Sequence, residues 1–211
     1  MKDLTSILIV FGVVLVSMIV HEIAHGAVAY FLGDDTAKNE GRLTFNPFKH
    51  IDPIMSLLVP MLLYLSGGPV FGGAKPVPID KSNLKYGEWG MAAVAFAGPV
   101  ANLLIALTAF LVGHFTGLIY GDGFAQLFFV EAVLINLGFM VFNLIPVPPL
   151  DGSRILYAIA PDGVRAGMVR MESMGIVVIY IMILLFGSAF SRLMSWGITS
   201  ILSGFYWLVG M

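Results

Sequence analysis

The sequence contains no cysteine, and this absence narrows the chemistry that the chain can perform. It excludes disulfides, thiolate metal ligands and a cysteine nucleophile, so any metal site must use His, Asp or Glu. Charge is also scarce, because only 11% of the 211 residues are charged and the formal net charge is -2. The basic residues stand singly rather than in a block, which argues against nucleic-acid binding.

What the sequence has in abundance is apolar side chains. They make up 58% of the residues, and the mean hydropathy is +0.92. The apolar stretches are spread from end to end, with no polar region long enough to form a second core. This composition predicts a single all-α polytopic membrane domain over residues 1–211, embedded in a lipid bilayer.

Five apolar stretches are typical of transmembrane helices, and a sixth is shorter. An α-helix rises about 1.5 Å per residue, so roughly 20 apolar residues cross a hydrocarbon core of about 30 Å. We therefore expect about five to six transmembrane helices, with a core at 4–156 and accessory C-terminal helices at 174–209. The five stretches are 4–32, 89–115, 124–145, 174–186 and 190–209.

The sixth stretch belongs to a Gly- and Pro-rich segment at 53–79. Its apolar part, 54–65, is interrupted by Pro60 and is short for a spanning helix. Residues 70–79 are predicted to be extended, and their backbone would be available to pair with another strand. We interpret the whole segment as a re-entrant or extended β-like element near the active site.

The basic residues suggest an orientation in the membrane. If the first helix starts outside, all Lys and Arg residues except Lys2 and Arg192 fall on the inner side. This distribution is what the positive-inside rule expects. It predicts an active site towards the cytosolic side.

The first apolar stretch ends in the pattern His21-Glu22-Ile23-Ala24-His25. Residues four apart lie on one face of a helix, so both imidazoles can reach one metal ion with Glu22 beside it. This spacing is typical of zinc metalloproteases, in which the glutamate acts as general base. The alternative is a helix face on which the two histidines bond each other, but ionisable groups inside a membrane are costly and are usually functional.

A catalytic zinc site normally has three protein ligands, so a third must come from elsewhere. His50 lies in a polar loop, and His114 is predicted at the opposite membrane face. Asp151 is better placed, because it follows a Pro-rich turn at the inner end of a span. The alternative for Asp151 is a role as a helix cap, which is common for Asp.

Three motifs together resemble the site-2 protease family of intramembrane zinc metalloproteases, in its compact prokaryotic form. They are HEIAH at 21–25, AGPVAN at 97–102 and NLIPVPPLDG at 143–152. The resemblance implies that His21, His25 and Asp151 bind zinc and that Glu22 is the catalytic glutamate. It also implies that Asn102 and Asn143 hold substrate, although both could instead form hydrogen bonds between helices.

The resulting hypothesis is an intramembrane zinc metalloendopeptidase with one Zn²⁺ per chain and transmembrane proteins as substrates. The resemblance places it in a prokaryotic cell membrane. Two alternatives are a zinc-binding membrane transporter and a catalytically inactive membrane scaffold. The transporter explains His and Asp in a cavity but not the glutamate between the histidines, and the intact Glu22 argues against the scaffold.

Overall fold

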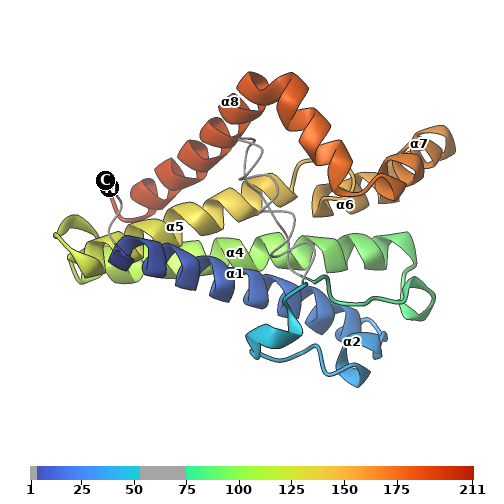
Figure 1. The fold of residues 1–211 in the computed structure, drawn as a ribbon, viewed down its shortest axis with the longest axis horizontal. Coiled ribbons are helices and arrows are strands. Elements are labelled where there is room, and N and C mark those ends of the chain that lie inside the picture. Colours follow the sequence, from blue (N-terminus) through green and yellow to red (C-terminus); the bar gives the residue numbers. More distant parts are fainter. Residues whose placement is uncertain (1–3, 53–74) are drawn as a thin grey trace.

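The computed structural model of the protein describes residues 4–52 and 75–211. Within these two ranges every regular element is a helix (Figure 1), which confirms the all-α prediction for the described chain. In chain order the elements are α1 (Leu4–Phe31), α2 (Thr36–Asn39), η1 (Pro47–Lys49), η3 (Lys81–Asn83), α4 (Glu88–Phe115), η4 (Leu118–Tyr120), α5 (Phe124–Asn143), α6 (Asp151–Ile159), α7 (Asp162–Ser173) and α8 (Ile176–Leu208).

Four of the described helices are long and apolar enough to cross a membrane. They are α1, α4, α5 and nearly all of α8, and their most apolar stretches have mean hydropathies of 1.9 to 2.5. In such a helix the backbone N–H and C=O groups form hydrogen bonds with each other, as the bilayer interior requires. The chain is therefore an integral membrane protein.

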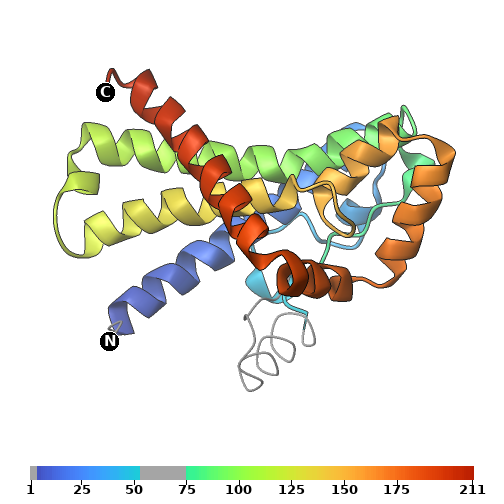
Figure 2. The same ribbon diagram turned by 90° about the horizontal axis from the view of Figure 1, so that it is seen from above.

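Helices α1, α4 and α5 lie alongside one another and form the centre of the molecule (Figures 1 and 2). Phe110 of α4 and Leu137 of α5 are fully buried in one apolar cluster, to which α8 contributes Phe205. A second cluster joins Val13 of α1 to Ala132 of α5. These contacts fix the three helices against each other and so set the relative positions of the side chains that they carry.

The C-terminal part differs from the sequence-based expectation. Two spans, 174–186 and 190–209, were predicted with an outer loop between them. The structure has two helical segments with a break near the predicted place, but they meet directly in a kink at Phe186 (φ -121°, ψ 21°) and together form α8. Gly187 and Ser188 follow the bend, and such Gly/Ser pairs kink helices without ending them. The described residues contain four candidate spans, with α8 counted once, and the total of five to six for the whole chain stays a prediction.

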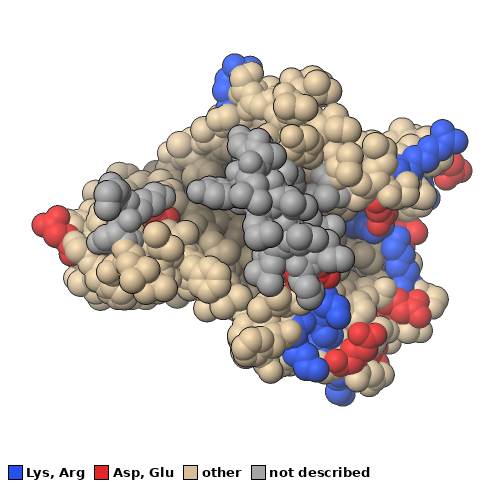
Figure 3. Space-filling model, in the orientation of Figure 1, with Lys and Arg blue, Asp and Glu red and all other residues tan. Residues whose placement is uncertain are grey.

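The two ends of the molecule differ in charge. Helices α2, α6 and α7 lie at one end, whereas the α4–α5 connection, the start of α1 and the end of α8 lie at the other (Figure 2). On the face shown in Figure 3, most of the Lys and Arg side chains gather at the end that holds α2, α6 and α7.

Most of the segment predicted as re-entrant, 53–74, lies outside the described residues. Residues 75–79 are described and form no strand with the rest of the described chain. Lys75 is held at both backbone groups, since its N–H donates to His50 O (2.8 Å) and its carbonyl accepts from Arg42 Nη2 (2.7 Å).

The far end of this segment is held by Asp34, a buried carboxylate just after α1. Asp34 accepts from the N–H of Asp80 (2.8 Å) and from Asn83 Nδ2 (3.2 Å), as well as from both the N–H and hydroxyl of Thr36. Hydrogen bonds from four donors offset the free-energy cost of burying the charged carboxylate. They tie the residues that follow 75–79 to the end of α1.

Candidate active site

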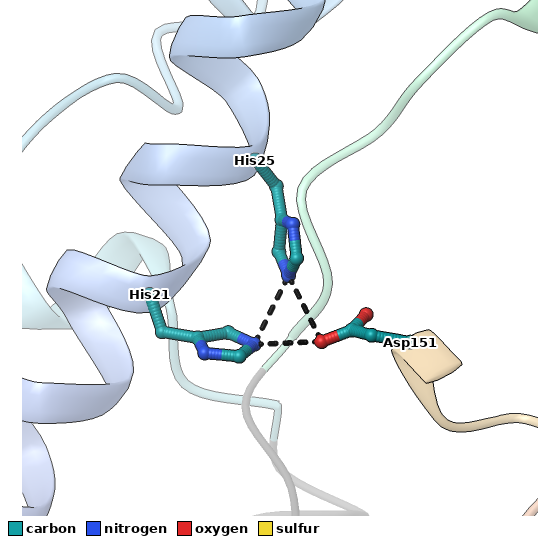
Figure 4. Close-up of side chains that lie close together, drawn as sticks. All are labelled: His21, His25 and Asp151. Carbon is teal, nitrogen blue, oxygen red and sulfur yellow. Dashed lines mark hydrogen bonds and ion pairs between the residues drawn. The ribbon is translucent and has the colours of Figure 1, made fainter. Parts of the chain in front are cut away.

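His21, His25 and Asp151 point towards one another (Figure 4). The two histidines project from one face of α1, and Asp151 approaches from the start of α6. The two Nε2 atoms are 3.0 Å apart, and Asp151 Oδ2 lies 3.2 Å from His21 Nε2 and 3.4 Å from His25 Nε2. These three side chains form a group whose ligand atoms all lie within 4.8 Å of one another.

Asp151 reaches the histidines because α6 begins close against the turn that follows α5. A Cβ atom at Gly152 would overlap the carbonyl oxygen of Leu144, so only glycine allows this approach. Asp151 is the first residue of α6, and within the described part of the chain no side chain makes a capping hydrogen bond at the start of this helix. The carboxylate is directed at the histidines, and the capping alternative is not observed.

Each histidine is held through its Nδ1 atom. His21 Nδ1 lies 2.6 Å from Asn102 Oδ1, and His25 Nδ1 lies 2.7 Å from the carbonyl oxygen of Val94. Both partners are oxygen atoms that can only accept, so each Nδ1 carries the hydrogen. The Nε2 atoms are then left with lone pairs that face Asp151.

These three atoms fit a metal ion. Two imidazole lone pairs and one carboxylate oxygen converge, and Asp151 Oδ2 is buried and receives no hydrogen bond from any residue within 4–52 and 75–211. Acceptors that face each other in this way need a cation between them. Two His and one acidic oxygen form a donor set found in catalytic zinc sites.

Gly98 of α4 makes room beside these atoms. A Cβ atom at this position would lie 2.5 Å from His21 Nε2 and 2.5 Å from His25 Nε2. Such distances are well inside van der Waals contact. The absence of a side chain at Gly98 therefore keeps open the space next to the converging ligand atoms.

Glu22 lies beside the histidines and is held by the neighbouring loop. Its Oε2 accepts a hydrogen bond from the N–H of Val77 (2.8 Å). Val77 stands between Pro76 and Pro78, which have no N–H, so the one backbone donor of this tripeptide is used on Glu22. The loop thus fixes one oxygen of the carboxylate.

The site opens into a cavity of about 540 Å³ between α1, α4, α5 and α6. Glu22, the three converging side chains and Asn143 all contribute to its wall. The other lining residues are Met18, Pro76, Val77, Ile79, Lys81, Met91, Val94, Ala95, Phe139, Phe142, Pro149, Leu150, Arg154 and Ile179. A mostly apolar wall with a few polar groups at one place is typical of an active site.

The remaining candidates from the sequence lie in different surroundings. Asn143 lines the cavity and donates to the carbonyl of Phe139 (3.0 Å). Asn102 is fully buried and has no exposed surface for a substrate. His50 and His114 are not part of the metal-binding group, since they bond Thr44 and Tyr120 respectively.

Sequence reasoning missed several groups that support the site. They are Asn136, which bonds Asn102, the carbonyl of Val94, the N–H of Val77 and the bare Cα of Gly98. Asn136 had a visible signal, because it is an amide in an otherwise apolar span. The backbone groups had none, since their roles depend on how distant segments pack.

Comparisons with known proteins bear on this site. The profile of Peptidase family M50 matches residues 117–187, a range that includes Asn143 and Asp151 but not the HEIAH motif. The protein of Bacillus subtilis (strain 168) named "Putative zinc metalloprotease YwhC" is 41% identical over 175 residues, which are 80% of this chain and 76% of that protein.

Two mycobacterial relatives both bear the name "Putative zinc metalloprotease Rip2". Rip2 of Mycolicibacterium smegmatis is 32% identical and Rip2 of Mycobacterium tuberculosis (strain ATCC 25618 / H37Rv) is 33% identical, each over 145 residues. The matched region is 65% of this chain and 52% of either relative, so the chain spans about half of their length. No solved structure matches the chain.

The similarity to YwhC covers most of both proteins. The relatives are named for zinc, and His21, His25 and Asp151 are a set of residues that suits zinc. The chain therefore belongs to the site-2 protease family, peptidase family M50, and is a zinc metalloprotease.

Proposed function

We propose that the protein is an intramembrane endopeptidase that cleaves peptide bonds in or near transmembrane segments of membrane proteins. The observation that carries this proposal is the convergence of His21, His25 and Asp151 on the wall of a cavity that also contains Glu22. Both histidines and Glu22 belong to α1, a candidate membrane span. Substrate would therefore be cut at membrane depth.

In this proposal His21, His25 and Asp151 hold one zinc ion. Zinc bound there supplies Lewis-acid polarisation of a peptide carbonyl and of water. Glu22, as a carboxylate, takes a proton from the water that attacks the carbonyl carbon. It returns the proton to the amide nitrogen as the C–N bond breaks.

For substrate binding we propose Asn143 and the backbone of residues 75–79. Residues that precede proline favour extended backbone, so Lys75 and Val77 are suited to a strand-like path along the cavity. Since the N–H of Val77 is used on Glu22, the opposite edge offers the carbonyls of Pro76 and Pro78 and no N–H. An unwound substrate would pair there through its own N–H groups. Asn102 is instead assigned a role in holding His21.

We further propose that the site faces the cytosolic side of a prokaryotic cell membrane. The basic residues support this orientation, because most of those visible in Figure 3 gather at the end that holds α6, the helix that carries Asp151. In this view residues 1–211 act as one domain.

The test compares zinc content and cleavage of single-span model substrates by the full chain in detergent. Glu22→Gln should keep about one zinc and lose cleavage, since the amide cannot accept a proton. Asp151→Ala should lose zinc. Asp122→Ala removes an exposed carboxylate at the opposite end of the molecule and serves as the matched control, which should retain both.

The same variants separate the alternatives. A zinc transporter would carry zinc into vesicles with Glu22→Gln as well as with the wild type, and a scaffold would show no cleavage with either. If folded Asp151→Ala keeps its zinc, the proposed ligand set is wrong. If the wild type binds zinc but cleaves no substrate in the panel, the proposal that it acts on transmembrane segments loses its support.

A further inference from the structure

Behind His21, two buried asparagines continue the hydrogen bonding across the bundle. Asn102 belongs to α4 and Asn136 to α5, and both side chains are fully buried. His21 Nδ1 lies 2.6 Å from Asn102 Oδ1, Asn102 Nδ2 lies 2.9 Å from Asn136 Oδ1, and Asn136 Nδ2 lies 2.8 Å from the carbonyl of Ala132. The chain of bonds thus runs from the α5 backbone to the proposed zinc ligand on α1.

The donor and acceptor of every hydrogen bond in this series are fixed by its first member, the carbonyl of Ala132. The Ala132 carbonyl can only accept, so Asn136 must present its NH₂ group to Ala132 and its oxygen to Asn102. Asn102 must then turn its NH₂ group to Asn136 and its oxygen to His21. As a result His21 carries its hydrogen on Nδ1 and leaves Nε2 free to bind metal.

His25 shows why the second asparagine matters. The Nδ1 atom of His25 bonds the carbonyl of Val94, a backbone oxygen whose direction is set by α4 itself. The partner of His21 is an amide side chain, which can present either its oxygen or its nitrogen. An NH₂ group turned to Nδ1 would place the hydrogen of His21 on Nε2 and block metal binding.

We propose that Asn136 is a positioning residue for zinc binding, which acts through Asn102 by fixing the orientation of that amide and hence the tautomer of His21. This inference rests on the proposed function, because it takes His21 as a zinc ligand. Groups that orient metal-binding histidines typically change metal affinity by roughly 10- to 100-fold when they are removed.

The experiment measures zinc affinity of the full chain in detergent by competition with a chelator. Asn136→Leu removes both hydrogen bonds at similar size, and we expect zinc affinity to fall roughly 10-fold. Asn102→Leu should weaken zinc at least as much. Since Asn136 acts only through Asn102, the double variant should match Asn102→Leu, and this lack of additivity is the signature of a relay.

Leu137→Ala is the matched control, because Leu137 is the next residue on α5 and is equally buried. It disturbs packing without touching the amides, so folded Leu137→Ala should keep the zinc affinity of the wild type. If Asn136 supported zinc binding only through the packing of α5, the packing defect of Leu137→Ala would lower zinc affinity as well. If Asn136→Leu does not fold, the smaller Asn136→Ala replaces it in the same cycle.

His21→Ala separates failure of this inference from failure of the proposed function. If His21→Ala binds zinc as the wild type does, His21 is not a ligand, and both proposals fall. If His21→Ala loses zinc but the folded Asn136 variant retains wild-type affinity, or if the effects of Asn102→Leu and Asn136→Leu add, only the relay is overturned.

Discussion

Helices α4 and α8 are alike in hydropathy but differ in their surroundings. The most apolar stretch of each has a mean hydropathy of 2.0, yet 39% of that stretch is buried in α4 and 11% in α8. The inner helix carries the fully buried Asn102 and the bare Gly98 beside the histidines. The outer helix exposes large apolar side chains such as Leu185 and Trp196.

The difference shows that hydropathy identifies a membrane helix but not its place in the bundle. Small residues let helices approach closely, and polar side chains find partners across them, so both gather where helices meet. Large apolar side chains can contact lipid at any position of a membrane helix, so they do not show where the helix lies in the bundle. A helix that lines the site, such as α4, is therefore distinguished from an outer helix by its few small and polar residues.

The strongest test of this comparison places the same substitution on both helices. Gly98→Ala adds a Cβ atom 2.5 Å from the Nε2 atoms of His21 and His25, so the ligands must move. We expect zinc affinity to fall roughly 100-fold, the upper end for changes around metal ligands. Gly204→Ala on α8 meets no atom of the described residues within 4 Å and should leave zinc binding unchanged.

Zinc affinity by chelator competition, together with zinc content after purification, decides the outcome. Equal affinities for the two alanine variants would mean that the close approach at Gly98 has no consequence for the metal. The distinction between α4 and α8 would then concern packing alone.

A second prediction concerns a contact to α1 that comes from a loop rather than from α4. Val77→Pro removes the N–H that holds Glu22 Oε2, while zinc ligands are untouched. Since general base catalysis contributes about 10²- to 10⁴-fold, loosening the base should lower kcat roughly 10- to 100-fold. Val77→Thr has nearly the same shape, keeps the N–H and is the control.

The measurement is kcat for a cleaved model substrate, with zinc content determined on the same samples. Full zinc with reduced kcat for the proline variant supports a loop that positions the base. Equal kcat for the proline and threonine variants would mean that Glu22 does not depend on residue 77.

The sequence was sufficient to predict the local part of the site. His21 and His25 follow from the helical period, because residues four apart share a face whatever the rest of the fold does. Asp151 needed more, since its pairing with α1 depends on the turn after α5 and on the close approach at Gly152. The prediction that it is a ligand therefore depended on the family resemblance.

The long-range part was not predictable in the same way. No spacing rule connects Asn136 to Asn102, because they meet only through the packing of α4 against α5. The bend at Phe186 is a further example, since Gly187 and Ser188 allow either a loop or a kinked helix. Only the contacts of the folded chain distinguish the two.

The smallest predicted effect concerns a buried polar side chain away from the metal. Asp34 accepts hydrogen bonds from Thr36, Asp80 and Asn83, and Asp34→Asn replaces an acceptor oxygen by a donor. We expect a loss of about 1–3 kcal/mol in stability, with zinc affinity unchanged. Asp35→Asn, at the exposed neighbouring position, changes the same charge and should leave stability nearly unaffected.

The pH dependence gives this prediction its sign. Burial alone would raise the pKa of Asp34, but the bonds from Thr36, Asp80 and Asn83 outweigh it and hold the pKa below the ordinary value of 3.8. The carboxylate therefore stabilises the fold fully above that value, and the contribution is lost as the pH falls through the lowered pKa. In thermal unfolding of zinc-free protein at pH 7, the wild type should have a higher midpoint temperature than Asp34→Asn. The difference between the two midpoints should narrow below about pH 4. A difference in midpoint that stays constant down to pH 2 would mean that the charge of Asp34 does not stabilise this end of the molecule. A lower zinc affinity of Asp34→Asn would show that Asp34 also affects the metal site.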